Sequence, residues 1–554
     1  MNQPIDLGHP RRRAVLAVMC LSLLVVVIDN TILNTALPTL ARVLAASTSG
    51  LQWITDAYTL TFAALLVMAG ALGDRFGRRR ALLLGLVIFA SGSAWAAVSG
   101  DASTLIAARA VMGLGAAFVM PATLSILTAV FPARERAGAI SAWSAIAGVG
   151  IVVGPTLGGL LLAHFYWGSV FWVNVPLVAV AIVAVLTVVP DLPGIRAAGT
   201  RLDVLGAALA SAAMLAIVDA VIEGPNRGWT SPVILGELAL GALLVAAFIY
   251  RELHAASPLI DVRVFRYRAF SAASSAIGLT FLALFGSLFA LTQYLQLVHG
   301  YSPLSAGVRA LPFAAAVLVT APLSSILVAR LGVRVVVPAG LTAMGGGLVL
   351  LTRATPTTSY TFLAIGVAIM GAGMGLVMAP SGTSIMSVLP AEQYGAGSAV
   401  NDTVQELGAS LGIAIIGSVV ASSFRHSLNV SRLPGTLVAA MRPSIADADA
   451  VAARTGSLAP HVLGIAHQSF TTAMTTGFAV AGIVAFAGAI LAAIALPGRP
   501  VRVSAASAPE DAVHPGRPRV AGPAGQPHGA VAAERLQSVL LATPGTRPAE
   551  NGIV

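Results

Sequence analysis

The sequence predicts an all-α membrane protein that crosses the bilayer many times. Of its 554 residues, 57% are hydrophobic and only 10% are charged, whereas about 25% of the residues in a soluble globular protein are charged. Mean hydropathy is +0.88. Apolar stretches of about 20 residues recur along most of the chain, and each can cross a hydrocarbon core of about 30 Å. A membrane β-barrel would instead show short segments of alternating polarity.

Fourteen apolar segments are candidates for transmembrane helices. They alternate with short polar or glycine-rich connections, as expected for helices that pass back and forth through a bilayer. The predicted segments are 14–35, 52–72, 81–99, 103–125, 138–162, 169–189, 203–222, 232–250, 271–297, 309–329, 335–352, 360–381, 404–423 and 473–496.

Arginine is concentrated in alternate connections. Arg11–Arg13 precede the first segment and Arg78–Arg80 follow the second, whereas the connections "AVSGDAST" and "HFYWGS" contain no arginine. Positive charge collects on the cytoplasmic side of membrane proteins, so residues 1–13 are predicted to be a cytoplasmic N-terminal tail. An even number of segments places the C-terminus in the cytoplasm as well. We therefore expect a multi-pass protein of the cell membrane.

Two segments are predicted to lie outside the membrane. Residues 425–468 form a long, polar stretch between the last two apolar segments, which predicts an extracytoplasmic loop. Residues 497–554 are rich in proline, alanine, glycine and arginine and show little periodicity. Such a composition buries too little apolar surface to fold, so a disordered cytoplasmic tail is predicted there.

The absence of lysine excludes several energy sources. A P-loop ATPase needs a lysine on the nucleotide phosphates, and a Schiff-base protein needs one for its covalent bond, but the sequence has none. Uphill transport would then draw on an ion gradient or on a partner chain. The one cysteine, Cys20, cannot form an internal disulfide. We expect no enzymatic activity, no cofactor, no metal, no ATP and no nucleic acid partner.

The connection "MAGALGDRFGRRRALLLG" gathers charge between two apolar segments. Glycine lets the backbone turn tightly, the aspartate can accept from helix N-terminal amides, and the arginines can form ion pairs across the connection. A simple cytoplasmic anchor with incidental glycines is the alternative. The candidate residues are Gly70, Asp74, Arg75, Gly77, Arg78 and Arg79.

Charged side chains inside the apolar segments are candidate functional groups, because an ionisable group in a membrane is costly without a partner or water. Arg109 and Asp29 lie well inside their segments, although Arg109 could also snorkel to an interface. Asp56 and Glu406 lie nearer the ends of theirs, where an interfacial position is the alternative. Asp219 and Glu237 lie in the seventh and eighth segments, and a structural or pairing role is expected for them.

The fifth segment contains "GVGIVVGPTLGGLL". Gly150, Gly154 and Gly158 are four residues apart, so they share one helix face and permit close helix packing. Pro155 removes a backbone donor and kinks the helix, and Gly159 follows the stripe. Close packing alone would explain this pattern.

Aromatic residues recur in the ninth segment. Phe281, Phe285 and Phe289 are four residues apart, with Tyr294 beyond them. Such a stripe is typical of core or lipid-facing packing. If it faced a cavity, it would suit planar apolar drugs through stacking and cation–π contacts.

Three of these patterns resemble signatures of the major facilitator superfamily. The 70–82 stretch is similar to G-x-L-a-D-r-x-G-r-[KR]-x-x-L, "LIAARAVMGLGAA" to the fourth-helix signature with Arg109 at its key position, and the glycine pattern to the antiporter signature G-x-x-x-G-P-x-x-G-G. Met112 stands where the family often has glutamine. The resemblance implies that the first connection latches two helical bundles on the cytoplasmic side, and that Arg109 takes part in proton transfer.

Further stretches resemble the fourteen-helix drug:proton antiporters of that superfamily. These are "VIDNTILNTALPTL", "LQWITDAYTL", "FWVNVPL", "SPLIDVRVFRYRAF", "GYSPLSAGVRALP" and "NDTVQELGASLGIA", although Gln405 stands where relatives often have arginine. The match covers about residues 15–425. It implies a major facilitator fold of two six-helix bundles, 14–189 and 271–496, with two inserted helices and a cytoplasmic linker in 190–270.

The residues and the resemblance together predict a proton-driven exporter of hydrophobic, often cationic, small molecules such as antibiotics and dyes. Its mechanism would be alternating access around a cavity near the bilayer midplane. An acid in apolar surroundings can hold a proton near neutral pH and release it when a cation arrives. The predicted proton-coupling residues are Asp29, Arg109, Asp56 and Glu406. The expected partners are small-molecule substrates, protons and membrane lipid, and the expected state is a monomer.

Other functions remain open at this point. The same scaffold could export a single metabolite or a lipid. A non-transporting receptor or assembly factor is a third possibility. Uptake by symport is disfavoured, because symporters of the superfamily generally lack the antiporter signature.

Overall fold

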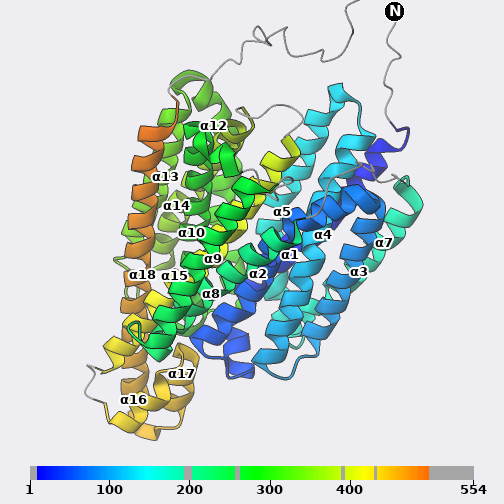
Figure 1. The fold of residues 1–554 in the computed structure, drawn as a ribbon. Helices are drawn as coiled ribbons and strands as arrows, with labels where there is room; N and C mark the ends of the chain where they lie inside the picture. The colour runs from blue at the N-terminus through cyan, green and yellow to red at the C-terminus, as the bar shows by residue number, and fades with distance from the viewer. Residues whose placement is uncertain (1–8, 192–202, 256–261, 388–393, 430–432, 498–554) are drawn as a thin grey trace, which may run out of the picture. The chain divides into compact units, whose positions relative to one another are not determined.

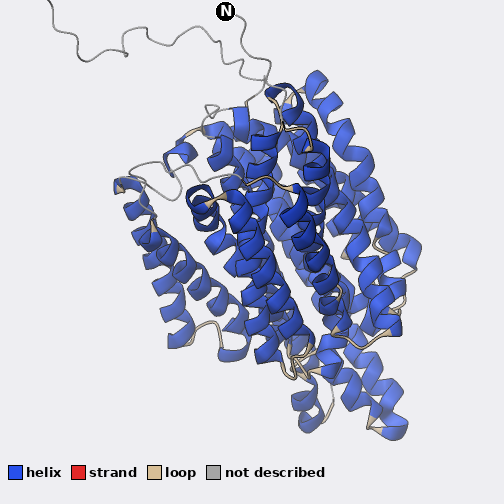
Figure 2. Cartoon of the chain, turned by 90° about the vertical axis from the view of Figure 1, so that its right-hand side faces the viewer, coloured by secondary structure: helices blue, strands red, loops and turns tan. Residues whose placement is uncertain are grey.

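The computed structural model describes residues 9–191, 203–255, 262–387, 394–429 and 433–497. The predicted disordered tail lies outside the described residues except for residue 497, and so do residues 1–8 and the side chain of Asp74. Within the described ranges the secondary structure is helical, with no β-strand (Figure 2). Thirteen described helical segments are long and apolar enough to cross a membrane. The helix Ala133–His164 covers the remaining predicted segment, 138–162, so the all-α membrane fold is confirmed.

The first group of helices contains α1 to α7 (Figure 1). Its closest packing joins α2 to α4, α3 to α4 and α1 to α5. Serine and aspartate side chains start two of these helices: Ser47 accepts from the Gly50 amide and Asp101 from the Thr104 amide, which satisfies amides that have no partner inside the helix. The helices are α1 (Arg12–Val43), α2 (Thr48–Phe76), α3 (Arg78–Ala97), α4 (Ala102–Val130), α5 (Ala133–His164), α6 (Ser169–Trp172) and α7 (Asn174–Val188).

A helical hairpin follows the first group. It consists of α8 (Val204–Arg227) and α9 (Pro232–His254). Helix α8 packs against both α2 and α15, where Val218 and Ile222 are buried beside Leu60 and Ala414. Helix α9 is largely uncovered by protein, as expected for a lipid-facing helix. The hairpin therefore lies beside the seam between α2 and α15.

The second group contains α10 to α18 (Figure 1). Its closest packing joins α10 to α15, α12 to α14 and α13 to α14. Helix α10 continues as one turn of π-helix, and α11 and α12 together form one membrane-spanning segment. The elements are η1 (Val262–Arg266), α10 (Arg268–Gln293), η2 (Tyr294–Val298), α11 (Pro303–Val308), α12 (Leu311–Leu331), α13 (Val333–Leu351), α14 (Tyr360–Ser387), α15 (Tyr394–Asn429), α16 (Gly435–Met441), α17 (Ile445–Ala453), η4 (Gly456–Leu458) and α18 (Ala459–Ala495).

The segment 425–468, predicted to be an extracytoplasmic loop, contains helical structure in its described part. Helix α15 continues to Asn429, α18 already begins at Ala459, and α16 and α17 lie between them. Ser444 accepts from the Asp447 amide and so starts α17. A short helix with a good N-cap tolerates polar residues when its other face packs, so a polar connection between two membrane-spanning helices can itself be helical.

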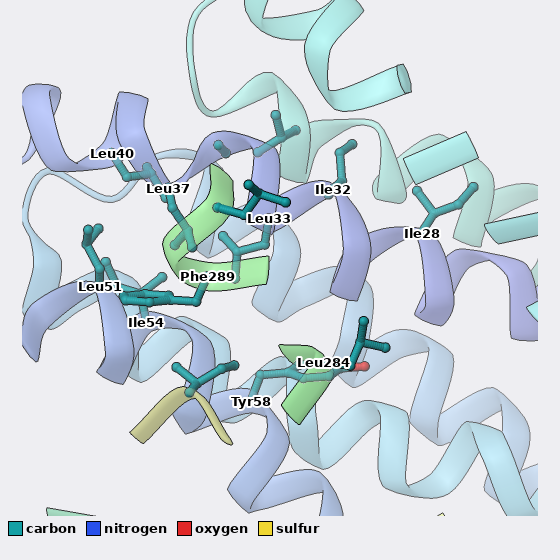
Figure 3. Packing of buried hydrophobic residues seen from close by; sticks show 14 of the residues in the cluster. Ile28, Ile32, Leu33, Leu37, Leu40, Leu51, Ile54, Tyr58, Leu284 and Phe289 are labelled. Carbon is teal, nitrogen blue, oxygen red and sulfur yellow. The ribbon is translucent and has the colours of Figure 1, made fainter. Parts of the chain in front are cut away.

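The two groups of helices contact each other at one end, which we call the closed end; it contains residues 44–52 and 299–303. Gln52 donates to the Ile413 and Ala414 carbonyls, 3.0 Å away in each case, and Gln296 donates to the Thr35 carbonyl over 2.8 Å. Phe289 of α10 lies among side chains of α1 and α2 (Figure 3). At the opposite end of α2, Phe76 is 59% exposed.

Candidate functional site

A buried ion pair joins α1 to α4. The Arg109 Nη1 atom lies 2.5 Å from the Asp29 Oδ2 atom, and both side chains are 0% exposed. Arg109 Nε also donates to the Ile54 carbonyl over 3.2 Å, and the guanidinium lies 4.3 Å from the centre of the Tyr58 ring. The two residues, predicted separately from the sequence, therefore form one unit. Arg109 does not snorkel to an interface.

The second oxygen of this carboxylate is held by α7. The Asn174 amide donates to Asp29 Oδ1 over 2.8 Å and contacts Ser93 Oγ at 3.1 Å. Ser93 in turn donates to the Phe171 carbonyl over 2.8 Å. The sequence analysis did not identify Asn174 as a site residue, although it lies in the quoted stretch "FWVNVPL". The signal that could have identified Asn174 is its polar amide side chain within an apolar segment.

One donor of this network has no partner. Arg109 Nη2 is buried and makes no hydrogen bond with any described residue. A buried guanidinium group with a free donor is destabilising unless it binds water or a moving group. The pair therefore has one hydrogen-bond donor, Arg109 Nη2, available for a further acceptor.

The remaining predicted acids lie apart from this pair, at the seam between α2 and α15. Asp56 is 0% exposed and its Oδ2 atom has no partner among the described residues. Glu406 Oε2 of α15 is also buried without a described partner. Asp402 lies one helical turn before Glu406 and accepts from the Asn401 amide over 3.2 Å. The sequence analysis missed Asp402, although its four-residue spacing from Glu406 places both on one helix face.

The arginine-rich connection binds helix ends of its own bundle. Arg78 donates to the Ser125 carbonyl of α4 over 2.9 Å, and Arg79 donates to the Leu186 carbonyl of α7 over 2.6 Å. Gly77 has a φ of 106°, which strongly favours glycine. A Cβ at Gly70 would touch Pro121, 3.4 Å away. Arg75 is exposed, and its guanidinium lies 5.6 Å from the Phe76 ring.

The glycine stripe of α5 packs on two partners. Gly150, Gly154 and Gly158 face α1: Thr31 donates to the Gly150 carbonyl over 3.1 Å, and a Cβ at Gly158 would come within 2.6 Å of Ile32. Gly159 faces the second group of helices, where an added Cβ would lie 2.7 Å from the Pro303 carbonyl oxygen. The motif thus includes a contact between the two groups as well as packing within one.

A cavity of about 130 Å³ lies between the two groups. Phe281 and Phe285 line it and stack on each other, with ring centres 5.7 Å apart. Tyr294 does not line it: its hydroxyl donates to the Thr355 carbonyl, 2.5 Å away, and the residue is 0% exposed. Phe289 is buried between the groups instead (Figure 3). The expected aromatic stripe is therefore divided between cavity wall and core.

Helix α1 connects the ion pair to the cavity. Asp29 belongs to the pair, while Thr31, Asn34 and Thr35 of the same helix line the cavity. Two packed groups of helices, a cavity between them and a buried charge pair beside it define a secondary transporter. Within the described part of the chain, no three histidine, cysteine, aspartate or glutamate side chains are placed to bind a metal ion.

Comparison with known proteins identifies the family. The family model described as Major Facilitator Superfamily matches residues 19–423, and the chain belongs to this superfamily. It is 38% identical over 403 residues to the Multidrug resistance protein Stp of Mycobacterium tuberculosis, covering 73% of this chain and 74% of that protein. It is 34% identical over 486 residues to the Tetracenomycin C resistance and export protein of Streptomyces glaucescens, with 86% and 90% covered.

A third relative and two solved structures extend this comparison. The Methyl viologen resistance protein SmvA of Salmonella typhimurium is 37% identical over 437 residues, with 77% of this chain and 86% of that protein covered. A bacterial homolog of the human lysosomal transporter Spinster, in an inward-facing conformation, has a TM-score of 0.62 at 18% identity and covers 87% and 98%. The xylose transporter XylE from E. coli has a TM-score of 0.55 at 13% identity and covers 88% and 98%. The two structures support the major facilitator fold.

Proposed function

We propose that this protein exports hydrophobic small molecules, cations among them, in exchange for protons. The observation that carries the proposal is the position of Asp29 in α1. Asp29 pairs with Arg109 of α4, and it lies two residues before Thr31, the first residue of α1 that lines the cavity. Relatives named for resistance to multiple drugs, tetracenomycin C and methyl viologen support an export function. The protein is a carrier and makes or breaks no covalent bond in its substrate.

The ion pair explains how a proton and a substrate can be linked. Protonation of Asp29 removes its negative charge and leaves Arg109 without a counter-ion in a dry region, which is strongly unfavourable. Helix α1 or α4 then moves so that Arg109 reaches another acceptor or water. Because α1 also forms one wall of the cavity, that movement changes the substrate site. Asp56, Asp402 and Glu406 at the α2–α15 seam are secondary proton sites in this scheme.

The decisive experiment uses purified protein in lipid vesicles with an imposed pH gradient and a panel of cationic and neutral aromatic compounds. The parent protein should accumulate several of them against their gradients. Asp29→Asn keeps the shape of the side chain and removes its titration, so pH-driven accumulation should fall to background. Asp101→Asn, which changes an exposed helix cap, is the matched control and should transport normally. Equal pH-driven export by the parent and Asp29→Asn would place the proton site elsewhere.

We further propose the placement of the chain in the cell. The protein lies in the plasma membrane as a monomer surrounded by lipid, with bundles 14–189 and 271–496, the insertion 190–270, both termini in the cytoplasm and the closed end outside. A cytoplasm-dependent reporter fused after Val554 should be active. External protease should cleave within 425–468 in intact cells, and cleavage from the cytoplasmic side alone would contradict this topology.

A further inference from the structure

The cavity between the two groups of helices contains one charged side chain. Of the described residues that line it, most are apolar, several carry hydroxyl or amide groups, none is acidic, and Arg309 is the only ionised one. Arg309 follows α11 at the closed end, and the Phe281 and Phe285 rings form part of the apolar wall. The cavity therefore combines a flat apolar surface with a single positive group.

The surroundings of Arg309 lack a counter-ion. Its guanidinium carbon lies 4.0 Å from the centre of the Tyr301 ring and 5.0 Å from that of Tyr360. Its Nη1 atom donates to the Ser305 carbonyl over 3.1 Å, whereas its Nε atom is buried and has no partner among the residues that the structure describes. Among the described residues, no carboxylate lies within ion-pair distance of Arg309.

This arrangement is costly without a ligand. Two aromatic rings attract a cation when they exclude water, but this replaces only part of the hydration that the guanidinium loses. An arginine fork binds carboxylate or phenolate oxygens through parallel hydrogen bonds. A second positive charge in the same cavity would instead be repelled. The positive charge of the cavity thus favours anionic ligands, whereas the acids at the α2–α15 seam favour cationic ligands.

We propose that this cavity binds planar aromatic molecules that carry a carboxylate or phenolate, with the negative oxygen on Arg309 and the ring against Phe281 and Phe285. The inference deepens the proposed export function and rests on it only in naming the molecule as a transport substrate. Aromatic anions are then substrates in their own right, and aromatic cations bind nearer the acidic seam.

Binding to the purified full chain in lipid nanodiscs tests this assignment. Three probes share one ring system: 2-naphthoate is an anion, 2-naphthamide is neutral and 2-naphthylmethylammonium is a cation. Equilibrium dialysis at pH 7.5 should show that the parent protein prefers the anion to the cation by about tenfold or more. Arg309→Gln should weaken naphthoate binding about tenfold and change naphthamide binding less than about twofold.

Two further variants control for charge and folding. Arg353→Gln removes an exposed arginine near the same end of the molecule and should leave all three affinities unchanged. Arg309→Lys keeps the charge without the planar fork and should bind naphthoate with intermediate affinity. Thermal unfolding of each variant in the same nanodiscs confirms that it is folded. If Arg309→Gln does not fold, the anion preference of the parent and the effect of Arg309→Lys still decide the question.

The possible outcomes separate this inference from the proposed function. A parent protein that prefers the cation, or an Arg309→Gln variant that changes all three probes equally, would overturn the assignment of the cavity. Export of cations driven by a pH gradient, measured in vesicles, could persist in both cases, and the proposed function would then stand. Arg309-dependent naphthoate binding without pH-driven export of any compound would support the cavity assignment and contradict proton-coupled export.

Discussion

Two arginines of this protein meet aromatic rings inside the membrane region, and they differ in one respect. Arg109 lies 4.3 Å from the centre of the Tyr58 ring and Arg309 lies 4.0 Å from that of Tyr301. Arg109 also has a counter-ion, Asp29, whereas no described carboxylate pairs with Arg309. The first charge is neutralised by the protein, and the second is available to a ligand.

The difference separates two tasks of a coupled carrier. A neutralised pair responds to a proton, because protonation of the acid exposes the charge of the arginine. An unpaired arginine responds to a negatively charged ligand, because that ligand supplies the missing counter-ion. Helix α1 links the two regions, since it carries Asp29 and three of the cavity-lining residues.

The largest expected effect is a difference in stability between the variants that neutralise the two arginines. Arg109→Gln leaves Asp29 as a buried unpaired charge, which should lower the free energy of unfolding by about 3–5 kcal/mol and abolish pH-driven export. Arg309→Gln leaves no orphaned partner and should not destabilise the protein. Thermal unfolding and vesicle transport measure both results.

A double variant makes this comparison sharper. Asp29→Asn combined with Arg109→Gln removes both charges, so most of the lost stability should return while coupling stays absent. If the double variant loses as much stability as the two single variants together, Asp29 and Arg109 do not interact as we infer. Equal losses for Arg109→Gln and Arg309→Gln would show that the two sites do not differ as we infer.

A substitution at Gly159, where α5 contacts the second group of helices, should have an intermediate effect. A methyl group at Gly159 would meet the backbone at Pro303 and Leu304 in the other group of helices. Gly159→Ala should therefore weaken the closed end by about 1–3 kcal/mol and slow transport without loss of membrane insertion. Gly236→Ala is the matched control, because an added Cβ there meets no atom within 4 Å. Cross-linking across the closed end and transport rates provide the readout, and equal behaviour of the two variants would count against a moving contact.

The smallest expected effect is a pH dependence at the Arg309 region. Burial, followed by the neighbouring His467 and Arg309, lowers the pKa of the His299 imidazole below its usual value. The ring is therefore neutral at pH 7.5, and it gains a proton only in more acidic solution than an ordinary imidazole requires. Protonation then adds a second positive charge near Arg309, so naphthoate affinity should rise about twofold to threefold between pH 7.5 and pH 5.5.

The groups that face His299 define the control for this measurement. Its Nε2 atom lies 2.9 Å from the Tyr294 hydroxyl, and its ring stacks on Tyr301 at 5.3 Å. Since the Tyr294 hydroxyl already donates to the Thr355 carbonyl, Nε2 carries the proton in the neutral ring. His299→Gln should remove the rise in naphthoate affinity. A rise that survives in this variant would contradict the role of His299 in the pH dependence.

Much of the site was predictable wherever a charge stood in an apolar run. Asp29, Arg109, Asp56 and Glu406 stand out in the sequence because the membrane makes an ionised group costly at any position. Asn174 was missed because an amide carries no charge. Arg309 was missed because it lies at the start of its predicted segment, where an interfacial position explains it equally well.

The aromatic residues of α10 and η2 do not all face the cavity, and the reason is geometric. Residues four apart on an α-helix drift by about 40° at each step, so Phe281 and Phe285 share the cavity wall while Phe289 has turned into the core. Beyond them the chain forms a π-helix at Tyr294–Val298, which shifts the helix phase again. Tyr294 consequently points to the Thr355 carbonyl and away from the cavity.

By itself the sequence determined the class of fold, an all-α membrane protein, and the charged residues within its apolar segments, because burial in lipid depends on composition and length. Only the tertiary structure decided that Asp29 pairs with Arg109, that Arg78 and Arg79 bind helix ends of their own bundle, and that Gly435–Met441 and Ile445–Ala453 form helices. Which charge is neutralised and which stays available depends on contacts between residues far apart in the chain. The free energy of a buried charge is set by those neighbours rather than by its place in the sequence.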